Sequence, residues 1–81
     1  PRTVSGRREE ALEKVTTALG AAEEVLEPLK EEIEGLRDSL EEHFSETQRF
    51  ASVSEAADAL DTGLTQVQES REVLDGIDFS W

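Results

Sequence analysis

The chain has no cysteine and only one histidine. The absence of cysteine excludes disulfides, and one histidine cannot build a zinc site of the Cys/His type. The 81 residues are expected to form a single helical domain (1–81), a size at which one core supplies roughly 3–5 kcal/mol of stability. With disulfides and zinc excluded, oligomerisation is the remaining way to bury more apolar surface.

Basic residues are also scarce. Eight Lys and Arg stand against 20 Asp and Glu, which gives a formal net charge of −12. This balance argues against direct binding to nucleic-acid phosphates or to anionic lipid, because both need clustered positive charge. No apolar run approaches the roughly 18 residues that a membrane span needs, and no signal-peptide pattern is present. The sequence therefore predicts a cytoplasmic protein that contacts neither nucleic acid nor membrane.

Motifs that carry catalysis or cofactor binding are missing as well. The glycines are isolated, so no phosphate-binding loop is expected, and no Ser/His/Asp set has a credible orienting partner. His43 lies among glutamates, but the residue three positions before it is Leu40 rather than the glutamate that a di-iron bundle requires. We expect no enzyme activity, no cofactor and no metal site.

What the sequence does contain is a regular apolar repeat. From position 12 the apolar residues recur at alternating steps of three and four, which is typical of a left-handed coiled-coil seam. With Leu12 at heptad position a, the a residues are Leu12, Leu19, Leu26, Ile33 and Leu40, and the d residues are Val15, Ala22, Leu29 and Leu36, followed by His43. No strand pattern competes with this repeat, so the fold class is all-α.

The first helix is predicted over about residues 7–44. Pro28 interrupts it and normally costs about 3 kcal/mol inside a helix. However, Pro28 falls at position c, away from the seam, and the heptad phase continues through it. We therefore predict one helix that bends at Pro28. The alternative is a true break there, which would give a three-helix bundle.

A connector and a shorter second helix follow. Ser52 and Glu55 fit a capping box, in which the two side chains satisfy free backbone donors at a helix start. The connector is therefore predicted at residues 45–52 and the second helix at about 53–75, with Gly76 as its stop. The aromatic tail comprises residues 76–81. The result is an antiparallel hairpin with a long, kinked first helix.

The unequal helix lengths lead to a functional hypothesis. A second helix of about 35 Å, folded back on a first helix of about 57 Å, runs out near Ala22 or Leu26. The seam residues Leu12, Val15 and Leu19 would then have no part of the same chain packed against them. We expect another helix to cover them, either from a second copy, which would complete a four-helix bundle, or from another helical protein. The predicted partner-binding residues are Leu12, Val15, Leu19, Ala22 and Leu26. The alternative is that the tail, with Ile77, Phe79 and Trp81, covers this end.

A second hypothesis rests on the acidic residues. Glu34, Asp38, Glu42 and Glu46 recur every four residues, although like charges at this spacing destabilise a helix by about 0.2–0.5 kcal/mol per pair. The functional interpretation is an acidic stripe at Glu34, Asp38 and Glu42 that binds a basic, nucleic-acid-binding protein as a decoy. The alternative is a solvated face in a salt-tolerant protein.

Overall fold

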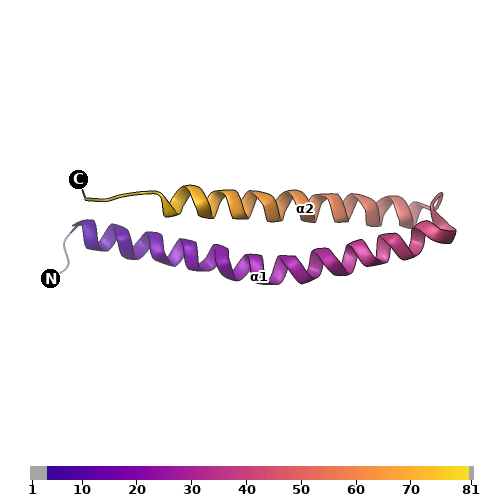
Figure 1. Ribbon diagram of the computed structural model, residues 1–81, viewed down its shortest axis with the longest axis horizontal. Coiled ribbons are helices and arrows are strands. Elements are labelled where there is room, and N and C mark those ends of the chain that lie inside the picture. The colour runs from indigo at the N-terminus through magenta and orange to yellow at the C-terminus, as the bar shows by residue number, and fades with distance from the viewer. Residues whose placement is uncertain (1–3, 81) are drawn as a thin grey trace.

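The described part of the chain is a hairpin of two long helices. The computed structural model describes residues 4–80, in which α1 spans Val4–Phe44 and α2 spans Gln48–Asp75, with no strand. Figure 1 shows α2 running back along α1 in the opposite direction, in a molecule 63 Å long and 17 by 14 Å in cross-section. The predicted all-α class is confirmed.

The first helix continues through Pro28 without a break. Figure 1 shows a shallow bend near the middle of α1. The three-helix alternative is therefore wrong, because the described residues form two helices. Pro28 is exposed, so the carbonyl that it leaves without a helical partner can be hydrated. Apolar seam residues continue on both sides of the proline and keep packing against α2.

The connector is shorter than the sequence suggested. The hydroxyl oxygen of Thr47 accepts a hydrogen bond from the backbone N–H of Phe50 at 3.1 Å, and the hydroxyl donates to the carbonyl of Phe44 at 2.7 Å. Thr47 thus caps α2 and ties it to the end of α1. The predicted connector at 45–52 and the capping box at Ser52 were wrong, because Ser52 lies inside α2.

The early start of α2 changes what covers the amino-terminal half of α1. Because α2 begins at Gln48, it extends far enough for Arg71 to pair with Glu23. The tail then continues alongside the start of α1 (Figure 1), where the Ser5 hydroxyl donates to the carbonyl of Phe79 at 3.0 Å. Leu12 and Leu19 are half-buried. The expectation that they lack intramolecular cover was wrong.

The tail therefore lies where the alternative interpretation placed it. Phe79 is half-buried, whereas Ile77 is 42% exposed. Trp81, which was expected to share this role, lies outside the described residues.

Two helices alone enclose almost no core. Among the described residues only Ala57 and Leu64 are buried, at 1% and 6% exposure. A helix in a hairpin has one neighbour, so its apolar side chains are covered on one side and remain open on the other. Figure 1 shows no third layer over either helix. The hairpin thus leaves part of its apolar surface in contact with water.

Candidate interaction surface

The apolar stripe of α1 is not covered evenly by α2. Every a residue from Leu12 to Leu40 is half-buried. In contrast, two large d residues, Val15 and Leu29, are 46% and 40% exposed. The helix α2 therefore packs closer to the a side of the stripe and leaves the d side partly open, at Val15 and Leu29 but not at Leu36, which is half-buried.

The residues of α2 follow the same heptad logic. Its a residues are Phe50, Ala57, Leu64 and Arg71, and its d residues are Val53, Leu60, Val67 and Leu74. The two buried residues are both at a, and all four d residues are only half-buried. In both helices the contact is thus shifted away from d.

Ion pairs mark the side toward which the contact is shifted. Lys30 Nζ lies 2.9 Å from Asp61 Oδ1, and both residues occupy position e of their helices. The hydrogen bond to Asp61, followed by the charge of the same carboxylate, raises the pKa of Lys30 above its ordinary value. The two e positions therefore meet on one face of the hairpin.

A second ion pair lies on the same face. The guanidinium of Arg71 donates to the Glu23 carboxylate and passes over Gly20, where an added Cβ would lie 3.5 Å from Arg71 Cζ. Glu23 is at e and Gly20 at the adjacent position b. Arg71 occupies seam position a in α2, but its guanidinium extends to the face on which the e positions meet.

The opposite face of the hairpin, which we call the open face, is formed by positions c, d and g of both helices. Antiparallel helices related by an approximate two-fold axis place equivalent positions on the same side, so the g positions meet opposite the e positions. Val25 and Val73 lie on the open face and are 67% and 71% exposed. Its small residues include Ala11, Ala18, Ala21 and Ala22 of α1 and Ala56, Ala59 and Gly63 of α2.

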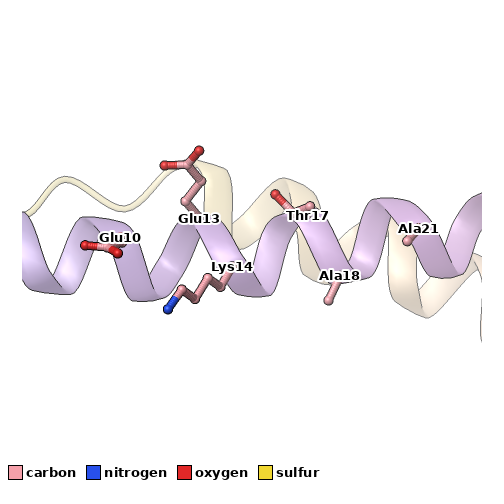
Figure 2. Close-up of a pocket in the computed structure, with 6 residues that line it drawn as sticks. All are labelled: Glu10, Glu13, Lys14, Thr17, Ala18 and Ala21. Atoms are coloured by element: carbon pink, nitrogen blue, oxygen red, sulfur yellow. The ribbon is translucent and has the colours of Figure 1, made fainter.

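Acidic residues are almost absent from the open face. All but two of those in the helices occupy positions b, e or f, and the exceptions are Glu32 at g and Glu42 at c. Figure 2 shows this division over two turns of α1, where Lys14 and Ala18 point to one side and Glu13 and Thr17 to the other. The six residues drawn there line a shallow groove on α1 alone. A chain of net charge −12 therefore presents one face nearly free of negative charge.

The structure divides the predicted partner-binding residues into two groups. Val15 and Ala22 lie at d, on the open face, whereas Leu12, Leu19 and Leu26 lie at a and face the contact with α2. Sequence reasoning considered only a and d, so it missed Val25 of α1 and Val73 of α2. The scarcity of acidic residues at c and g, in the same heptad register, was the available signal.

The predicted acidic stripe spans about 80° of the helix surface, from the acidic face to the margin of the open face. Glu34 is half-buried at position b, and Asp38 is exposed at f, where its Oδ1 lies 3.6 Å from Nε of Arg37. Glu42 lies at c, on the margin of the open face. Residues four apart advance by 40° around a helix with 100° per residue. The three carboxylates consequently wind from the acidic side toward the open face.

The described residues 4–80 hold neither a metal-binding group nor a membrane-spanning segment. No group of three or more potential ligands there is arranged to hold a metal ion. Neither helix has a segment long and apolar enough to span a membrane.

Comparison with known proteins assigns no relative. No protein-family model matches the chain, and no curated protein or solved structure matches it significantly.

Proposed function

We propose that this chain is a non-enzymatic protein-interaction module that associates with another helical surface through its open face. The proposal rests on the observation that exposed apolar side chains lie on the face from which acidic residues are almost absent. Val15, Val25, Leu29 and Val73 are each 40–71% exposed on this face. Covering a side chain of this kind contributes about 1.5–3 kcal/mol when burial is complete.

The charge distribution supports the same proposal. A helix face that contacts only solvent typically carries charges of both signs, which keep a domain soluble and monomeric. Here the charge is concentrated on the other face, and the open face carries small and apolar residues that permit close helix approach. This combination resembles half of a helical bundle, in which the apolar sides of two layers face each other.

A matched pair of substitutions tests the proposal. Val25→Asp places a charge on the open face, while Thr17→Asp adds the same charge at position f of the acidic face. Both side chains are exposed, so both variants should keep their helical circular dichroism. Association with a second copy, or with a partner retained from an extract of the source cells, should be lost in Val25→Asp and kept in Thr17→Asp. If the wild type stays monomeric to high micromolar concentration and retains no partner that Val25→Asp loses, the proposal is wrong.

A second candidate function uses the acidic face. The concentration of carboxylates at b, e and f favours binding to a basic protein, as a decoy for a nucleic-acid surface would do. Replacing Glu34, Asp38 and Glu42 with their amides should then weaken binding to a basic partner. Replacing only Glu34 and Asp38, which lie at b and f, should leave association through the open face nearly unchanged. Binding that does not respond to salt between about 50 and 300 mM would count against this candidate, because screening shortens the range of exposed charges.

A further inference from the structure

We propose that the partner on the open face is a second copy of this chain. The two hairpins would lie face to face and antiparallel, with α1 against α1 and α2 against α2. This inference rests on the proposed function and specifies its partner and register. In this arrangement a two-fold axis passes between the two α1 helices at the level of residue 24, which is the midpoint of Val4–Phe44. The two helices α1 would then overlap over their whole length.

Side-chain size along α1 favours this axis. The amino-terminal half of its open face has the small residues Ala11, Ala18 and Ala22 beside the larger Val15, and the large residues Val25, Leu29 and Leu36 follow. Antiparallel pairing about residue 24 sets Ala18 opposite Leu29 of the second copy and Ala22 opposite Val25. Val25, Leu29 and Leu36 therefore each meet an alanine, as close packing of facing layers requires, whereas Val15 lies level with Glu32.

On α2 the same axis lies beyond the helix midpoint, so the two helices α2 overlap over their second halves. The pairs Lys30–Asp61 and Glu23–Arg71 show which residues of the two helices lie side by side, and they place the axis between Val67 and Ser70 of α2. The exposed Val73 of one copy then lies near Gly63 of the other. A Cβ added at Gly63 would meet nothing within 4 Å in the single hairpin, so space for an incoming side chain is present there.

The few charges of the open face agree with the same register. Its basic residues in the first turns of α1 include Arg7 and Lys14, and its two acidic residues, Glu32 and Glu42, lie toward the turn. Pairing about residue 24 brings Arg7 near Glu42 of the second copy, and Lys14 near Glu32. Two-fold symmetry repeats each pair. A parallel arrangement would instead place like charges together.

The area of the face is sufficient for a stable dimer. The hairpin is 63 Å long and 17 Å wide, so full overlap covers on the order of 1,000 Å² per copy, against about 800 Å² per partner in a standard interface. Every neighbouring helix pair in the assembly would be antiparallel, which also pairs opposite ends of the helix dipoles.

Cysteine cross-linking tests the register directly, because the chain has no cysteine of its own. Ala18→Cys and Leu29→Cys are made separately, mixed in equal amounts and oxidised at micromolar concentration. The mixed disulfide should form in high yield. Each variant alone should cross-link poorly, because the two-fold axis separates equivalent residues by about 15–18 Å along the helices, beyond the Cα separation that a disulfide spans. A mixture of Ala11→Cys and Leu29→Cys is the matched control and should also react poorly.

The outcomes separate this inference from the proposed function. Efficient self-cross-linking of Ala18→Cys would indicate a parallel dimer and overturn the inference, while the interaction module would stand. A monomeric wild type that still binds a partner through Val25 would also overturn the inference alone. A monomer that binds no partner through Val25 would overturn both.

Charge exchange gives an independent readout. Glu32→Lys and Lys14→Glu should each weaken dimerisation by roughly three- to tenfold at low salt, because a like-charge contact occurs twice in the dimer. Mixing the two variants should restore affinity to within about twofold of the wild type through the heterodimer. Failure of the mixture to recover, with both variants helical, would exclude this register.

Discussion

Thr47 is the residue that ends the turn and starts the second helix. Its hydroxyl makes one hydrogen bond to each helix, to the carbonyl of Phe44 and from the N–H of Phe50. Thr47→Ala should lower the free energy of unfolding by about 1 kcal/mol, the usual cost of losing a helix N-cap. Urea unfolding followed by circular dichroism measures this change. Ser52→Ala is the control and should change stability little, because Ser52 is exposed inside α2; the opposite ranking would restore the capping box predicted from the sequence.

The ion pair between Lys30 and Asp61 makes the stability of the hairpin depend on pH in the alkaline range. Asp61 raises its pKa above 10.5 in the folded state. The pair therefore contributes fully below the ordinary lysine pKa of about 10.4, and its contribution is lost as pH rises through the raised folded value. The difference in melting temperature between wild type and Lys30→Gln should be constant from pH 7 to 9 and shrink above about pH 10.5. Asp61→Asn should show the same behaviour, and a difference that persists at pH 12 would contradict the assignment.

At the scale of the element, Pro28 is the weakest point of α1. It is exposed inside the helix, where it removes a backbone donor and crowds the preceding turn. Pro28→Ala should raise the free energy of unfolding by roughly 1–3 kcal/mol, measured by urea denaturation. Gly35→Ala, at another exposed c position where the new Cβ meets nothing within 4 Å, should raise it by about 0.5–1 kcal/mol. A loss of stability in Pro28→Ala alone would show that packing on α2 requires the bend.

The helices also show why heptad position alone did not locate the open face. The periodicity of Leu12 to Leu40 identified the correct stripe, but a stripe that includes d and g as well as a can be covered from either side. The ion pairs Lys30–Asp61 and Glu23–Arg71 lie on the e side of α1, toward which the contact with α2 is shifted. Val15 and Leu29, which a symmetrical seam would cover like the a residues, are consequently left 46% and 40% exposed.

At the scale of the whole molecule, the tail closes the open end of the hairpin. Deleting residues 77–81 removes the hydrogen bond from Ser5 to Phe79 and the half-buried Phe79 ring. We expect faster amide hydrogen exchange in residues 5–19 and unchanged exchange near the turn, with a loss of about 1–2 kcal/mol in stability. Ser5→Ala should reproduce only a minor part of the effect. Unchanged exchange at residues 5–19 in the deletion variant would show that the tail does not protect α1.

The amino-acid sequence by itself determined the helical class, the register of the long seam and the stop at Gly76, because these depend on spacing and local backbone preference. It did not determine where α2 begins, since Ser52 and Thr47 are both suitable caps and only the contact with Phe44 distinguishes them. That start decides how far α2 reaches along α1, and hence that Leu12 and Leu19 are shielded. The tertiary structure alone also decided which side of the stripe stays open, because this depends on the rotation of one helix against the other, which only contacts between residues distant in the chain, such as Lys30 and Asp61, reveal.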